Sequence, residues 1–103
     1  MNTESLKDKI YETLHTVYDP EIPVNIVELG LIYELEIGEE GKVKILMTLT
    51  APGCPVAGDI VVEVQEKVGA LEEVNDVYVQ LTFDPQWTMD MMSEEARLEL
   101  GFL

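Results

Sequence analysis

Cysteine is nearly absent from this chain of 103 residues, in which Cys54 is the single example. One cysteine cannot form an internal disulfide, which fits a reducing compartment, so we expect a cytoplasmic protein. No apolar run approaches the ~20 residues that a membrane-spanning helix requires, and the N-terminus lacks the apolar core of a secretion signal. The sequence therefore indicates neither a secreted disulfide scaffold nor a membrane protein.

Basic residues are also scarce, because six lysines and arginines stand against 21 acidic residues, for a formal net charge of −15. So acidic a chain repels phosphate backbones, and no basic patch is visible, so we do not expect nucleic-acid binding. The acidity favours solubility, with attraction to basic partners or metal cations as a sharper interpretation. An apolar content of 47% indicates a globular protein, and the length fits one domain over residues 1–103.

Hydrophobic periodicity predicts the order helix, strand, strand, helix, strand, helix. Asn25 and Gly30 bracket an additional single helical turn. With helices layered on its sheet, the chain is expected to be an α+β two-layer sandwich with a three-stranded mixed sheet, whose strand order stays open. If the second and third strands are parallel, their crossover should be right-handed. The expected helices cover 3–17, 56–68 and 93–101, and the expected strands cover 31–37, 42–50 and 77–83.

The most distinctive stretch runs from Thr48 to Ala57, between an expected strand and an expected helix. Pro55 follows Cys54, and proline is favoured at the first helical position because its missing N–H would be unpaired there. Cys54 is therefore the expected N-cap residue, where free N–H groups and the helix dipole stabilise thiolate over thiol. Thr48 and Thr50 are expected to project together from the strand's end. Their hydroxyls either help form a pocket or simply suit an exposed strand face.

Asp19 and Glu21 place two carboxylates in a proline-stiffened segment after the first helix. They are candidates to bind a cation, orient a thiol partner or cap a turn, although Asp-Pro is also an ordinary turn opener. His15 is expected to be a boundary histidine, with a ligand or base as the minority interpretation. A tryptophan in a position like that of Trp87 most often covers the hydrophobic core as a lid, and a partner-binding anchor is the alternative.

Three segments together resemble a known family: D-P-E-I-P-V-N-I-V-E-L-G-L-I-Y (19–33), T-L-T-A-P-G-C-P (48–55) and F-D-P-Q-W (83–87). In this order they resemble the SufT/PaaD-like iron–sulfur assembly family, and the ending S-E-E-A-R-L-E-L-G (93–101) is similar to stand-alone bacterial members. The resemblance implies an accessory role in maturing iron–sulfur proteins rather than enzymatic turnover. It also implies the small fold shared with the C-terminal domain of Nfu-type cluster carriers.

The resemblance further implies a site and a set of partners. The expected partners are the iron–sulfur assembly machinery and client apo-proteins, and a homodimer is a further option. Because a stable cluster normally needs four protein ligands, no stably bound cofactor is expected. Cys54 would instead contact iron or a cluster transiently, alone or shared across a dimer. The implied pocket comprises Cys54, Asp19, Glu21, Thr48 and Thr50, with Trp87 as the partner-binding residue of the third segment.

Some features depart from parts of that family. The chain lacks the C-terminal cysteines of PaaD-like members, which argues against the phenylacetate-oxygenase branch, and it lacks a Walker sequence, so any nucleotide chemistry belongs to a partner. Gln86 stands where the third segment usually has a second proline.

Two other functions stay open. A thiol enzyme would use Cys54 as nucleophile and His15 as base, oriented by Asp19, whereas a structural adaptor would bury Cys54 as a small apolar residue.

Overall fold

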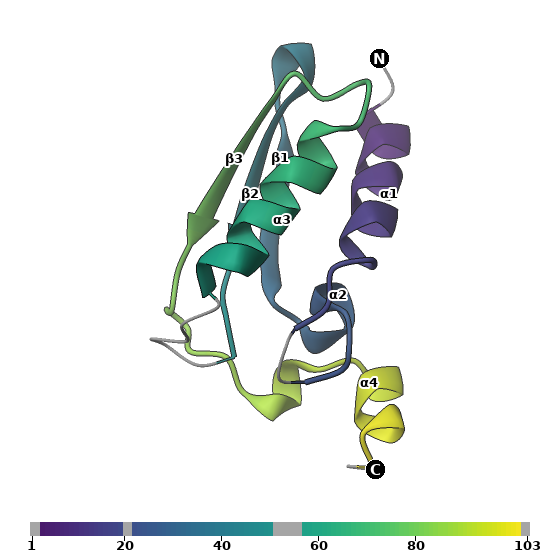
Figure 1. Cartoon of the computed structure of the whole chain (residues 1–103), viewed down its shortest axis with the longest axis vertical. Helices are drawn as coiled ribbons and strands as arrows, with labels where there is room; N and C mark the ends of the chain where they lie inside the picture. Colours follow the sequence, from purple (N-terminus) through teal and green to yellow (C-terminus); the bar gives the residue numbers. More distant parts are fainter. Residues whose placement is uncertain (1–2, 20–21, 51–56, 102–103) are drawn as a thin grey trace.

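Alternating apolar and polar residues build a three-stranded sheet in the computed structural model of the chain (Figure 1). β2 is the central strand, antiparallel to β1 and parallel to β3. The expected three-stranded mixed sheet is confirmed, and the strand order that the sequence left open is β1-β2-β3. The structure describes residues 3–19, 22–50 and 57–101, and its strands are β1 (Ile32–Ile37), β2 (Lys42–Met47) and β3 (Asp76–Leu81).

The two long helices pack against each other on one face of the sheet, with α1 beside β1 and α3 beside β3 (Figure 1). Parallel neighbours require a crossover connection, which α3 supplies between β2 and β3. The short helices α2 and α4 contact each other beyond one end of the sheet (Figure 1). None of the helices in the described part of the chain is both long and apolar enough to cross a membrane. The helices are α1 (Thr3–Leu14), α2 (Ile26–Leu29), α3 (Ala57–Gly69) and α4 (Glu94–Glu99), with single 3₁₀ turns η1 (Glu39–Gly41) and η2 (Met89–Met91).

The hydrophobic core fills the space between the helix layer and the sheet. Along β2, buried and outward residues alternate, as expected for a strand with one covered face. The opposite side of the core comes from the apolar stripe that the sequence predicted for the first helix. The fully buried members of that stripe are Leu6, Ile10, Leu14 and Val17.

Local capping signals fix the ends of α2, as the sequence predicted. The Asn25 side chain accepts a hydrogen bond from the Glu28 amide at 2.9 Å, which caps the N-terminus. Gly30 caps the C-terminus with a φ of 80°, a conformation that glycine adopts without steric cost. A Cβ atom on Gly30 would lie 2.3 Å from the carbonyl oxygen of Met91, so the close approach of η2 also requires glycine.

β2 ends before the residue that the sequence pattern predicted. The ladder stops at Met47 instead of Thr50, and Thr48 and Leu49 are both buried, so the alternation between the two faces also stops. Beyond Met47 one hydrogen bond continues the antiparallel register, because the Thr48 amide donates to the Leu31 carbonyl at 2.8 Å. Thr48 and Thr50 therefore lie beyond the end of β2, and their joint projection into a pocket stays a prediction.

Candidate functional site

Two of the five predicted pocket residues, Cys54 and Glu21, lie outside the described residues. The N-cap position of Cys54 and the role of Glu21 accordingly stay predictions. Asp19, Thr48 and Thr50 are described, and they lie in segments that flank the undescribed ones. Within the described part of the chain, no three His, Cys, Asp or Glu side chains form a group that could hold a metal ion.

Thr48 is a fully buried polar residue directly after β2. Its backbone is fixed by the hydrogen bond to Leu31, but its Oγ1 atom has no hydrogen-bond partner among the residues that the structure describes. An unpaired buried hydroxyl costs about 1–3 kcal/mol, so native structures rarely keep one without a purpose. Thr50, two positions further on, is half-buried. Thr48 is thus the described member of the predicted pocket with unused hydrogen-bonding capacity.

Asp19 is a buried carboxylate, 6% exposed, held in a tight turn. Its Oδ1 accepts a hydrogen bond from the Ile22 amide at 3.0 Å, and its own amide donates to the Val24 carbonyl at 3.3 Å. Of the roles predicted for this residue, capping a turn is therefore one that it performs.

Backbone hydrogen bonds connect the Asp19 segment to Thr48 through α2. The Ile26 amide donates to the Val17 carbonyl at 2.9 Å, and the Leu31 amide donates to the Ile26 carbonyl at 3.0 Å. The bond from Thr48 to Leu31 continues the series. The segment after α1 and the end of β2 therefore meet at the same end of the sheet (Figure 1). That Asp19 and Thr48 belong to one pocket stays a prediction.

Trp87 occupies the position of a core lid. It is 9% exposed, and its Nε1 donates to the Leu29 carbonyl at 2.6 Å. The structure therefore shows the indole ring buried against α2 rather than presented at the surface. A partner-binding role for Trp87 stays a prediction, and in this arrangement it would act by positioning α2.

His15 is exposed at the end of α1, and both ring nitrogens have neighbours. Nδ1 lies 2.7 Å from the Tyr11 carbonyl oxygen, and Nε2 lies 3.4 Å from Oε1 of Glu28. The thiol-enzyme hypothesis required Asp19 as the carboxylate that orients this imidazole, whereas Glu28 stands beside it here. The other carboxylate oxygen of Glu28 accepts a hydrogen bond from the Ser93 hydroxyl.

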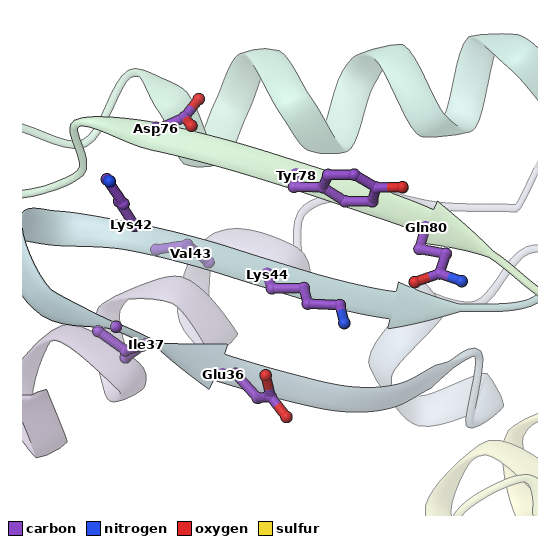
Figure 2. A pocket seen from close by; sticks show the side chains of 9 residues that line it. Glu36, Ile37, Lys42, Val43, Lys44, Asp76, Tyr78 and Gln80 are labelled. Atoms are coloured by element: carbon purple, nitrogen blue, oxygen red, sulfur yellow. The ribbon is translucent and has the colours of Figure 1, made fainter.

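The face of the sheet away from the helices carries a shallow hollow of about 760 Å³ that sequence reasoning did not identify. Glu36, Lys44 and Tyr78 lie across it in register on three adjacent strands (Figure 2). Lys42 and Lys44 have no ion-pair partner among the described residues, and Tyr78 is 58% exposed. With Glu36 and Asp76 at the same hollow, the charges of the two signs nearly balance. The alternating outward residues were readable in the sequence, but their side-by-side arrangement required the strand order.

The family of proteins described as iron–sulfur cluster assembly proteins matches residues 7–97 of this chain. An Fe-S protein maturation auxiliary factor from Porphyromonas gingivalis is 54% identical, and the alignment covers 100% of both chains. The auxiliary factor YitW from Bacillus subtilis is 46% identical over 95% of this chain and 96% of its own. The auxiliary factor SufT from Staphylococcus aureus is 40% identical over 82% of this chain and 97% of its own.

Solved structures show the same fold. A DUF59 domain of unknown function from Bacillus anthracis superposes with a TM-score of 0.90 at 39% identity, covering 97% of this chain and 95% of that one. A conserved hypothetical protein from Thermotoga maritima superposes with a TM-score of 0.80 at 43% identity, covering 92% and 93% of the two chains. These similarities extend over nearly the whole domain.

Proposed function

This chain belongs to the iron–sulfur cluster assembly protein family, and we propose that it is a non-catalytic auxiliary factor whose cysteine contacts cargo or client transiently. Its broader role is in iron–sulfur cluster assembly and the maturation of iron–sulfur proteins, as the names of relatives that match most or all of its length indicate. The cargo is iron or an iron–sulfur cluster, and the partners are the assembly machinery and client apo-proteins. We place this function in the cytoplasm.

The observation that carries the proposal is the buried, unpaired hydroxyl of Thr48. A hydroxyl held in this way can donate a hydrogen bond to a thiolate or sulfide without first losing a protein partner. The Asp19 turn is fixed to the same end of the sheet through α2. The proposed pocket therefore consists of Asp19, Thr48 and Thr50 together with the segments that carry Glu21 and Cys54.

The contact with cargo is transient because the donor set is small. A cluster is normally held by about four protein ligands, mostly thiolates, and this chain contains one cysteine. The remaining ligands would come from a client, from a small thiol or from Cys54 of a second copy. An arrangement that supplies only one thiolate favours release to a client over permanent storage.

The thiol-enzyme alternative gains no support from the described residues. His15 has a carbonyl oxygen at one ring nitrogen and the Glu28 carboxylate at the other. A general base for Cys54 would have to leave this arrangement before it could accept a proton from the thiol. The names of the relatives also describe auxiliary factors rather than enzymes.

Replacement of the cysteine tests the proposal in cells. In a strain depleted of the wild-type protein, Cys54→Ser is expected to fail to restore the activity of a cluster-dependent enzyme, while its circular dichroism and melting temperature stay those of the wild type. Met89→Ser is the matched control, because Met89 is 52% exposed and its sulfur lies outside the proposed pocket. Full rescue by Cys54→Ser would refute the role of the thiol.

Anaerobic reconstitution tests the cargo directly. The wild-type protein is incubated with iron and sulfide, and metal binding is followed by visible absorption and native mass spectrometry. Iron or cluster adducts are expected on the wild-type protein and are expected to disappear in Cys54→Ser. Equal adducts on both proteins would contradict a cysteine-dependent cargo contact.

A further inference from the structure

A groove of about 600 Å³ lies between the end of α1, α2 and α4, apart from the predicted pocket residues. Its buried side includes Val24 and Ala96, which are 2% and 1% exposed. Two large apolar side chains also line it and are open to solvent: Tyr18 is 57% exposed and Leu98 is 65% exposed. Exposed apolar side chains beside an apolar floor are typical of a surface that binds another molecule.

The same groove is strongly acidic. Its lining includes Glu28, Glu95 and Glu99, and His15 is the one lining residue among those described that can carry a positive charge. Glu95 and Glu99 lie one helical turn apart on α4, a spacing at which two like charges destabilise a helix. Glu99 also lies in the last turn, where the helix dipole disfavours an anion.

The protein's own cations do not compensate these carboxylates. Arg97, on the same helix, pairs with Asp90 at 2.8 Å, and no ion pair to Glu95 or Glu99 is found among the described residues. α4 therefore keeps two unfavourably spaced carboxylates directed to the groove without an internal counter-charge. An external cation at this place would relieve both the mutual repulsion and the unfavourable interaction with the helix dipole.

We propose that this groove docks a basic, amphipathic segment of a partner protein. Lysine or arginine side chains one turn apart would pair with Glu95 and Glu99, and an apolar side chain between them would contact Tyr18 and Leu98. A second copy is a poor occupant, because two chains of net charge −15 repel each other. The same net charge accelerates association with a basic segment, and this acceleration weakens as salt increases.

The location of the groove gives this docking a consequence for the neighbouring site. Tyr18, Pro23 and Val24 line the groove, and they lie on either side of Asp19 in the chain. A segment bound in the groove would lie against the same turn that fixes the Asp19 carboxylate. The inference goes beyond the proposed function, because it assigns a docking surface that does not involve Cys54.

An NMR titration tests the proposal with a defined probe. The probe is a short, capped helical peptide with two arginines one turn apart and a leucine between them, added to the full-length ¹⁵N-labelled protein at low and at high salt. Amide shifts are expected at Tyr18, Glu28 and Leu98, with weaker binding at high salt. A peptide with glutamates in place of the arginines serves as the reversed-charge probe and is expected to produce no shifts.

Matched variants separate the groove from general acidity. Glu95→Gln with Glu99→Gln is expected to weaken binding roughly fivefold, as the loss of two exposed ion pairs predicts. Glu34→Gln with Glu36→Gln removes the same charge from β1 and is expected to leave binding within about twofold.

Three results would overturn the proposal. The first is equal weakening by both double variants, which would indicate non-specific attraction to an acidic protein. The second is a set of peptide-induced shifts centred on the open sheet face instead of the groove. The third is a set of groove shifts that depend on protein concentration without any peptide, which would assign the groove to a second copy. Since Cys54 takes no part in the titration, such a failure would leave the proposed function standing.

Discussion

The replacement Thr48→Val separates a structural role for this buried threonine from a functional one. Valine has nearly the shape of threonine but no hydroxyl, so the substitution removes the polar atom and keeps the packing. If the hydroxyl stabilised the fold through a hydrogen bond, its removal would lower the free energy of unfolding. A hydroxyl without a partner in the free protein costs desolvation energy instead, and its removal should stabilise the protein.

The expected magnitude follows from the environment of the hydroxyl. Thr48 is 0% exposed, and its Oγ1 has no hydrogen-bond partner among the described residues. The full desolvation penalty of such a group is about 1–3 kcal/mol. In a domain of this size, a gain of about 1 kcal/mol raises the melting temperature by roughly 4–8 °C. We therefore expect Thr48→Val to melt at least several degrees above the wild type while supporting client maturation less well.

The assay combines thermal unfolding, followed by circular dichroism, with rescue of a cluster-dependent enzyme in depleted cells. Thr82→Val is the matched control, because the Thr82 hydroxyl accepts a hydrogen bond from the Asp84 amide at 3.2 Å. That control is expected to lose about 0.5–1.5 kcal/mol of stability. A lower melting temperature for Thr48→Val would show that its hydroxyl is already paired in the free protein, and the argument for a reserved donor would fail.

Two further substitutions test the scaffold around α2 by urea unfolding. Trp87→Phe leaves a buried carbonyl of α2 unpaired and is expected to cost about 1–3 kcal/mol of stability. Tyr33→Phe is the control, because it removes an exposed hydrogen bond and should cost less. Equal losses of stability would contradict the buried position of the indole. Gly30→Ala is expected to cost clearly more than about 1 kcal/mol, because its Cβ would collide with η2. Gly101→Ala is the control, since Gly101 has the same φ of 80° but no atom within 4 Å of the added Cβ. An equal loss of stability in both variants would show that the contact with η2 is not what requires glycine at position 30.

Features set by local hydrogen bonds were predictable from the sequence. Asn25 caps α2 through the Glu28 amide, and Ser93 caps α4 through the Ala96 amide at 3.1 Å. Each cap involves residues three positions apart, so the chemistry needed for the prediction lies within one short window. The same holds for Gly30 as the terminator of α2. The element order followed from these signals together with hydrophobic periodicity.

Features set by distant residues were not predictable in the same way. The alternating pattern of 42–50 runs on to Thr50, whereas the pairing along β2 stops at Met47, and no local property of that stretch indicates the earlier end. The acidic groove likewise depends on how α4 packs on α2, where the Ser93 amide donates to the Glu28 carbonyl at 2.8 Å. The sequence showed the residue types of the groove but not that three separate segments would converge.

That convergence explains why the sequence segments that carry the family resemblance are so widely spaced. Each of the later segments makes a hydrogen bond to the first one, 19–33. Thr48 donates to Leu31, and Trp87 donates to Leu29. The Tyr33 hydroxyl donates to the Pro85 carbonyl at 2.8 Å, and Ser93 binds both the backbone and the side chain of Glu28.

The first segment is thus the common support of the proposed cargo pocket and of the proposed docking groove. Its short helix, α2, accepts backbone hydrogen bonds from Leu31 and from Ser93, and Leu31 in turn accepts one from Thr48. A partner that moved α4 would act on Glu28 and hence on the segment that fixes Thr48 and the Asp19 turn. If both proposals hold, docking of a basic segment and exposure of the Thr48 hydroxyl should be thermodynamically coupled. The stabilisation gained by Thr48→Val would then change when the helical peptide is bound, and an unchanged difference would show that the two sites act independently.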